Sequence, residues 1–205
     1  MTKAGEKRAQ IVTVFGSSRP REGDSHYDDA RELGAALASS GFVVCSGGYA
    51  GVMEAASRGA KEAGGRTIGI TSKSLERSAN RWVDEEVRVK SWQDRLFELV
   101  IRGDGYVICP GGTGTLAELA VVWEMVNKGV MAAKPLVTLG PFWTPVIKCV
   151  REVELGHETK WGEQEGPLVK AASSGADAAK YLSEYFAKKR THVARRRGKV
   201  KHFLW

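Results

Sequence analysis

A glycine-rich segment with a carboxylate close behind it is the part of the sequence whose residue types suggest chemistry. The segment CPGGTGTLAE, residues 109–118, lies between an apolar run, GYVIC, and a helical pattern, LAELAVVWEMV. Glycine lets the backbone approach an anion closely, and the first turn of a helix leaves its N–H groups unpaired. We therefore predict that this loop binds a phosphate through Gly111, Gly112, Thr113, Gly114 and Thr115.

Two more loops have a similar composition. FGSSR follows the apolar run QIVTVF, and CSGGYAG follows FVVC. In open parallel sheets, ligands bind at the carboxyl ends of the strands, where such loops lie. The three loops together favour a phosphate-bearing ligand, although any one of them also fits a tight turn before a helix. The residues expected to contribute from these two loops are Gly16, Ser17, Gly47 and Gly48.

Glu118 lies within the first turns of the predicted helix. A carboxylate repels a phosphate, so we expect it to face the rest of the ligand. If that ligand is a nucleoside 5′-monophosphate, the sugar carbon C1′ lies in that direction. A carboxylate there can stabilise an oxocarbenium-like transition state or deprotonate an attacking water. The alternative is structural, because an acid near a helix N-terminus is favourable by itself.

Several other chemistries find no support in the sequence. The loop GTGTLAE lacks the third glycine of a dinucleotide fingerprint, and the sequence contains no P-loop. The four histidines are scattered, and Cys45, Cys109 and Cys149 have no metal-binding or disulfide spacing. Cys45 and Cys109 end apolar runs, which indicates buried thiols. We expect neither a metal nor a redox cofactor.

Short apolar runs alternate with longer helical patterns along the chain. This alternation predicts an α/β fold with a single, doubly wound, mainly parallel Rossmann-like sheet and helices on both faces. A helix over 91–103 is expected to begin with a capping pair, Ser91 and Asp94. The segment 71–85 is interpreted as either a mobile lid or a surface loop. Strands are expected over 10–15, 42–45, 66–70, 85–90 (weaker, near an edge), 105–109 and 134–140, with two helical stretches after them.

The charge of the chain is concentrated near its C-terminus. Of its 31 Lys and Arg residues, eight lie in residues 188–201, and the remaining 23 nearly balance the 24 acids. We therefore predict a nucleotide-binding domain over residues 1–187 and a basic tail over 188–205. The tail is either a solvated segment or a nucleic-acid contact. No apolar run approaches the roughly 18 residues of a membrane helix, and no secretory signal is seen, so we expect a cytoplasmic protein without a membrane partner.

The combined pattern resembles the Lonely Guy (LOG) family of cytokinin riboside 5′-monophosphate phosphoribohydrolases, whose members are often labelled lysine decarboxylases. The resemblance runs from about Ile11 to Leu139 and is strongest in PGGTGTLAE, which matches the family's P-G-G-x-G-T-x-x-E at every fixed position. It implies a Rossmann-like homodimer that releases a free base and ribose 5-phosphate from a nucleotide such as AMP. It also implies that Arg95 and Glu118 are the catalytic pair and that Met53 helps to line the pocket.

The chain departs from the family's pattern at three positions. Gln93 and Leu96 stand where the family has histidine and lysine, and Glu54 replaces a small glycine. The stretch GVMEAASRGAKEAGG, residues 51–65, is also similar to molybdenum-cofactor carrier proteins of the same fold. The alternative function is therefore that of a non-catalytic binder or carrier of a phosphorylated small molecule.

Overall fold

One seven-stranded sheet forms the centre of the molecule. The structure is a computed structural model, and it describes residues 8–155 and 168–200. The strand order is β4-β3-β2-β1-β5-β6-β7, and every neighbouring pair is parallel. The predicted fold class is confirmed. The strands are β1 Ile11–Phe15, β2 Val43–Ser46, β3 Thr67–Ser72, β4 Glu85–Val89, β5 Gly105–Ile108, β6 Leu136–Leu139 and β7 Val169–Ala172.

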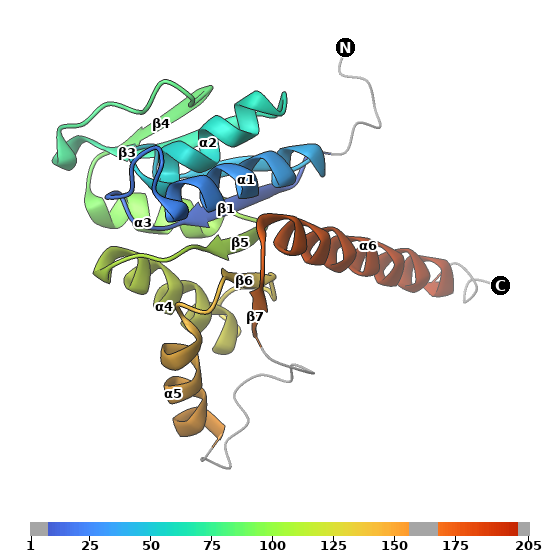
Figure 1. Ribbon diagram of the computed structural model, residues 1–205. Helices are drawn as coiled ribbons and strands as arrows, with labels where there is room; N and C mark the ends of the chain where they lie inside the picture. The colour runs from blue at the N-terminus through green and yellow to red at the C-terminus, as the bar shows by residue number, and fades with distance from the viewer. Residues whose placement is uncertain (1–7, 156–167, 201–205) are drawn as a thin grey trace.

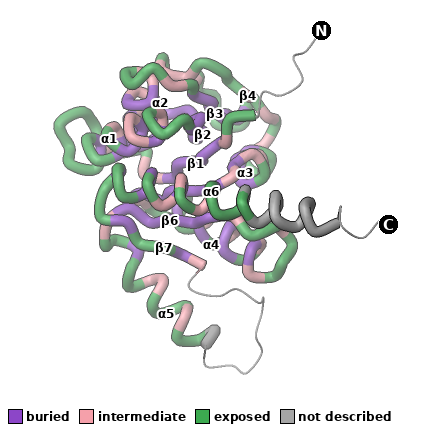
Figure 2. The backbone as a smooth tube through the Cα atoms, turned by 90° about the vertical axis from the view of Figure 1, so that its right-hand side faces the viewer, coloured by how far each residue is buried: buried purple, intermediate pink, exposed green. Residues whose placement is uncertain are grey.

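Helices cover both faces of the sheet (Figure 1). One hydrophobic core joins the sheet to α1 (Ser25–Ser39), α2 (Val52–Glu62) and α6 (Gly175–Val200). A second core joins the opposite face to α3 (Trp92–Arg102) and α4 (Thr113–Asn127), with α5 (Thr144–Leu155) at its border. Alternate residues of a strand point to opposite faces. Because helices cover both faces, the central strands are buried along their whole length (Figure 2).

The strand order reverses between β1 and β5. Strands β1 to β4 follow one another toward one edge of the sheet, whereas β5 returns to the other side of β1 and begins the second half. At such a point the loops that leave two neighbouring strands diverge to opposite faces and leave a crevice between them. The loops after β1 and β5 are two of the three predicted phosphate loops.

Two glycines bring α1 and α2 into close contact. A Cβ atom on Gly34 of α1 would lie 2.0 Å from the carbonyl oxygen of Ala56, and one on Gly59 of α2 would lie 1.8 Å from that of Arg31. Both distances are far below van der Waals contact. The glycines thus allow the helix backbones to touch, which fixes α2 beside α1.

Several predictions about individual elements are confirmed. β4 is an edge strand, Ser91 and Asp94 form a reciprocal capping box at the start of α3, and Cys45 and Cys109 are buried free thiols. Strand β7 was missed, because its sequence VKAA has only two buried residues and no apolar run.

The C-terminal helix concerns the predicted domain boundary at residue 187 and the basic tail. Helix α6 continues past residue 187 as far as Val200 and projects from the body (Figure 1), whereas residues 201–205 of the basic tail lie outside the described residues. The domain boundary at 187 stays a prediction. Among the described residues, no helix combines the length and the apolar character that crossing a bilayer requires.

Candidate active site

The backbone of Ser17 joins the three glycine loops at the carboxyl edge of the sheet. Its N–H donates to the carbonyl oxygen of Pro110 in the loop after β5, at 3.1 Å. Its own carbonyl oxygen accepts from the N–H of Val52 at the start of α2, at 2.9 Å. The Trp143 indole donates to the carbonyl oxygen of Cys109 at 2.9 Å, which holds the third loop from its other side. The loops that the sequence singles out therefore form one connected edge.

The glycines of the third loop fall into two kinds. A Cβ on Gly111 would lie 2.3 Å from the Oγ1 atom of Thr115, so this glycine is needed for packing. By contrast, a Cβ on Gly112 or Gly114 would meet nothing within 4 Å, and neither residue has a positive φ. The fold itself does not require glycine at these two exposed positions. We interpret them as the open floor of a phosphate cradle, which residues 111–115 form together with the adjoining Ser17, and in which a phosphate can reach the N–H groups that begin α4.

Arg95 is held rigidly beneath the second glycine loop. Its Nε donates to the carbonyl oxygen of Ile70 at 2.8 Å, and its Nη2 donates to that of Gly47 at 3.1 Å. A Cβ on Gly47 would lie 1.6 Å from Nη2, so only glycine leaves room for the guanidinium. The guanidinium also lies 5.1 Å from the ring centre of Tyr49, a favourable cation–π distance.

These contacts leave the Nη1 atom of Arg95 facing Glu118. Nη1 lies 4.0 Å from the Oε1 atom of Glu118, which is an ion pair but too long for a hydrogen bond. Both side chains are almost withdrawn from water, with 8% and 13% of their surfaces exposed. Among the described residues, Nη1 donates no hydrogen bond, so its N–H groups are available to a ligand.

Burial gives Glu118 unusual acid–base properties. Burial raises the pKa of its carboxyl to about 7, and the positive charge of Arg95 opposes this rise. Burial also lowers the pKa of Arg95, whereas the nearby Glu118 raises it. The guanidinium nevertheless stays protonated, as it does in proteins generally. A carboxyl with a pKa near 7 can accept and return a proton at neutral pH, as a general acid or base must.

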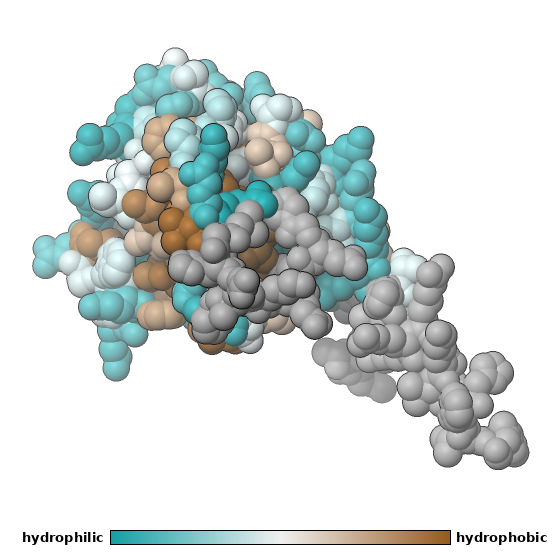
Figure 3. Space-filling model, turned by 90° about the horizontal axis from the view of Figure 1, so that it is seen from below, coloured by the Kyte–Doolittle hydropathy of each residue, from teal (hydrophilic) through white to brown (hydrophobic). Residues whose placement is uncertain are grey.

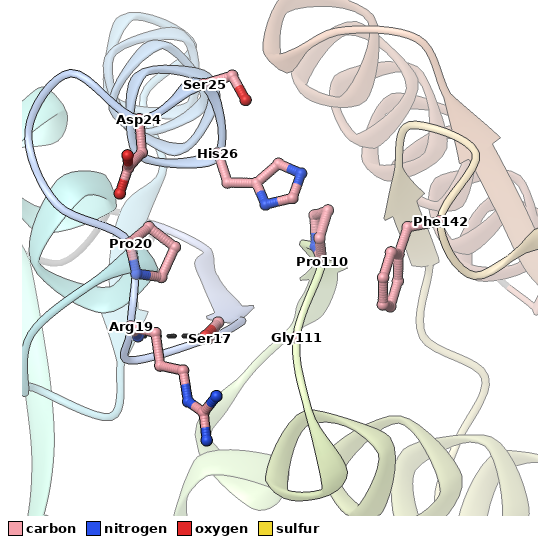
Figure 4. Close-up of a pocket in the computed structure, with 9 residues that line it drawn as sticks. All are labelled: Ser17, Arg19, Pro20, Asp24, Ser25, His26, Pro110, Gly111 and Phe142. Carbon is pink, nitrogen blue, oxygen red and sulfur yellow. Dashed lines mark hydrogen bonds between the residues drawn. The ribbon is translucent and has the colours of Figure 1, made fainter.

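A cavity of about 510 Å³ adjoins the cradle (Figure 4). We call it the α1 cavity, because residues before and at the start of α1 form one of its walls. The loops after β5 and β6 form the opposite wall. Its lining residues are Ser17, Arg19, Pro20, Asp24, Ser25, His26, Pro110, Gly111 and Phe142.

The other predicted site residues occupy different positions along this edge. The Met53 Sδ atom lies 3.6 Å from Nη2 of Arg95, so Met53 belongs to the group around the guanidinium. Gly16 is needed for packing, because its Cβ would lie 2.4 Å from a Val52 methyl group. Gly48 has a φ of +74° and supports the turn of the second loop. The binding roles assigned to these residues stay predictions.

Two residues that the sequence analysis did not single out help to build the site. Tyr49 packs over Arg95, and its hydroxyl accepts from the N–H of Ser72 at 2.9 Å. The Asn80 amide donates to the carbonyl oxygens of Gly48 and Tyr49, at 3.0 and 2.9 Å. Asn80 thus ties part of the segment 71–85 to the second glycine loop. An aromatic residue within SGGYAG was a usable signal for Tyr49, whereas nothing around Asn80 marked it.

The three departures from the Lonely Guy pattern have different surroundings. Leu96 is buried in the core between α3 and the sheet. Gln93 is exposed on α3, and the Oε1 atom of Glu54 lies 3.5 Å from the Tyr27 hydroxyl. Leu96 therefore packs as an ordinary core residue, although it adjoins Arg95 in the sequence.

Comparisons with known proteins show which family this chain resembles. The model of the SLOG cluster4 family matches residues 9–154. A cytokinin riboside 5′-monophosphate phosphoribohydrolase of Mycobacterium tuberculosis is 34% identical over 134 residues, which cover 64% of this chain and 71% of that protein. This relative confirms the resemblance to the Lonely Guy enzymes.

Solved structures of another functional type are also similar. The molybdenum cofactor binding protein of Rippkaea orientalis has a TM-score of 0.70 at 26% identity, and the molybdenum cofactor carrier protein of Chlamydomonas reinhardtii has one of 0.68 at 28%. Each comparison covers 88% of this chain and 99% of the other. Since the family model spans most of the sequence, including all three glycine loops, Arg95 and Glu118, the chain belongs to the SLOG cluster4 family.

Proposed function

We propose that the protein hydrolyses the N-glycosidic bond of a nucleoside 5′-monophosphate, of the AMP or cytokinin riboside monophosphate type, to a free base and ribose 5-phosphate. The observation that carries this proposal is the buried Glu118 carboxyl facing the fixed guanidinium of Arg95, beside an open glycine cradle. A site that binds only a phosphate gains nothing from a buried carboxylate, because the two anions repel each other. The M. tuberculosis relative, which carries the name of this activity, supports the proposal.

The geometry suggests a role for each group. The cradle binds the 5′-phosphate, and Glu118 lies one helical turn beyond it, where the sugar follows. Glu118 accepts a proton from a water whose oxygen bonds to C1′, while the electron pair of the C1′–N bond passes to the base. The base then takes up a proton. Arg95 orients the carboxylate and offers Nη1 to ligand oxygens.

A non-catalytic carrier of a phosphorylated small molecule, such as molybdenum cofactor, is the second candidate function. The observation that favours it is the similarity to structures of molybdenum cofactor carrier and binding proteins over 88% of this chain. A phosphate cradle serves a carrier as well as an enzyme. The buried pair Arg95 and Glu118 is the feature that a carrier does not need, and it makes hydrolysis the better-supported proposal.

We also propose that the protein is a cytoplasmic homodimer. Large apolar side chains are exposed on the two helices that carry the reacting pair: Trp92, Phe97 and Ile101 on α3, and Leu116 on α4. Apolar side chains also gather on the side of the molecule where α4 and α5 lie (Figure 3). Exposed apolar patches of this kind mark interaction sites.

Replacing Ile101, which is 66% exposed, tests the proposed dimer surface on α3 and α4. The wild type is expected to sediment as a dimer in analytical ultracentrifugation, and Ile101→Glu as a monomer, because a buried, unpaired carboxylate opposes association. Leu75→Glu is the control, since Leu75 is an exposed apolar residue (39%) that follows β3 and lies outside α3, α4 and α5. A monomeric wild type, or a variant that still dimerises, contradicts this surface.

Replacing the carboxylate tests the chemistry. Glu118→Gln is expected to reduce base release from AMP by about 10²–10⁴-fold, because the amide cannot accept the proton. Glu124→Gln on the same helix is the matched control, since its side chain is 58% exposed, and it should retain activity. Base release is followed by chromatography. A wild type that releases no base from any nucleoside monophosphate, and that co-purifies with an intact phosphorylated ligand, excludes the hydrolase and favours the carrier.

Replacing an open glycine tests the cradle. Gly114→Ala should leave the free energy of unfolding unchanged or raise it by up to about 1 kcal/mol, because alanine is the better helix former. The added methyl group should nevertheless raise the KM for AMP about tenfold by filling the place of the phosphate.

Gly34→Ala is the matched control, because the same replacement at this position should affect stability and not binding. Its methyl group meets the backbone of Ala56, so it should cost about 1–3 kcal/mol of stability and leave the KM unchanged. Urea unfolding and steady-state kinetics measure the two effects. An unchanged KM in Gly114→Ala means that the phosphate lies elsewhere.

A further inference from the structure

We propose that the α1 cavity binds a second phosphate, so that the site takes nucleoside 5′-diphosphates, either free or esterified to a further group. This inference rests on the proposed function, since it places the first phosphate in the cradle.

The position of the cavity relative to the reacting pair supports a ligand that continues beyond its first phosphate. Arg95 donates to the carbonyl oxygens of Gly47, directly after β2, and of Ile70, within β3. The cradle lies at the ends of β1 and β5. The α1 cavity lies farther along the same edge, where Phe142 follows β6, and it shares Ser17 and Gly111 with the cradle. A phosphate in the cradle thus has the sugar on one side and the cavity on the other.

The wall of the cavity carries groups that bind anions. Arg19 is exposed, and among the described residues its guanidinium has no hydrogen bond or ion pair. Figure 4 shows this guanidinium near the Gly111 segment, and the His26 ring directed toward Pro110. The Ser17 hydroxyl accepts from the N–H of Arg19 at 3.1 Å, which leaves its proton free to be donated to a phosphate oxygen.

The loop that carries Arg19 is held in a defined shape. The Nη1 atom of Arg21 donates to the carbonyl oxygens of Ser18, Arg19 and Pro20, at 3.1, 2.8 and 3.1 Å. Asp24 is the one carboxylate among the lining residues, and its Oδ2 accepts from the Arg21 N–H at 2.7 Å. Arg21 and Asp24 therefore maintain the loop, and Arg19 remains for a ligand.

The volume of the cavity and the apolar part of its wall indicate that the ligand can continue beyond the second phosphate. A volume of about 510 Å³ is in the usual range for small-molecule sites and is more than one phosphate group fills. Pro20 adds apolar surface beside Arg19, and Pro110 and Phe142 add it on the opposite wall. Such a wall suits a sugar or another group esterified to the second phosphate.

Calorimetry with AMP, ADP and ADP-ribose tests the proposal. The full chain carrying Glu118→Gln is used as the parent, so that the ligands stay intact. ADP is expected to bind about tenfold tighter than AMP, because a charge-assisted contact to Arg19 is added. Adding Arg19→Ala should remove this gain and change the affinity for AMP less than about twofold. Arg66→Ala is the control, because Arg66 is also exposed but lies before the amino end of β3, away from the carboxyl edge that holds the cavity.

Each outcome has a distinct meaning. Tight ADP and weak ADP-ribose identify a free diphosphate as the ligand, and tight binding of both identifies an esterified one. AMP that binds as well as ADP overturns the inference and leaves the proposed function intact. A gain that persists in Arg19→Ala, or that is equally lost in Arg66→Ala, also overturns it. Failure of all three ligands to bind contradicts the proposed function as well.

Discussion

Arg95 carries a full positive charge into the interior of the sheet's carboxyl edge, where an unpaired charge would be strongly unfavourable. The carbonyl oxygens of Gly47 and Ile70 and the ring of Tyr49 compensate for its lost hydration. Three directions around the guanidinium are thereby occupied by backbone and ring, and the remaining one points at Glu118. The position of the carboxylate's partner is therefore determined by the sheet itself, before any ligand arrives.

The glycine loops serve two physical purposes that their composition alone does not separate. Gly47 and Gly111 are glycines because a neighbouring side chain occupies the place of a Cβ atom. Gly112 and Gly114 have no such neighbour, and they leave open space above the start of α4. The first group makes the edge rigid, and the second leaves it open. A rigid edge with an open floor orients a phosphate and hence the sugar bound to it.

The sequence predicted six of the seven strands. Five of them are buried and read as continuous apolar runs, as is usual in a parallel sheet. The sixth, β4, is mostly exposed and alternates charged and apolar residues. β7 has no such run, and only its pairing with β6 makes it a strand. Within the site, Arg95 and Glu118 were identified because they belong to motifs with regular spacing. The role of Asn80 was not predictable, since it depends on a contact with a loop about 30 residues earlier in the chain. The same applies to Arg19, whose position depends on how its loop folds back on the cradle.

The proposed chemistry depends above all on the pKa of Glu118. This pKa can be measured by carbon-13 NMR of labelled glutamate carboxyls, with the signal assigned from its loss in Glu118→Gln. We expect a pKa of about 7, because burial disfavours the charged form, so the carboxylate ionises as the pH rises through neutrality. Replacement of Arg95 by glutamine should raise the pKa further, since the nearby positive charge lowers it. An ordinary value near 4.5, unchanged by that replacement, would contradict the buried pair on which the proposed chemistry rests.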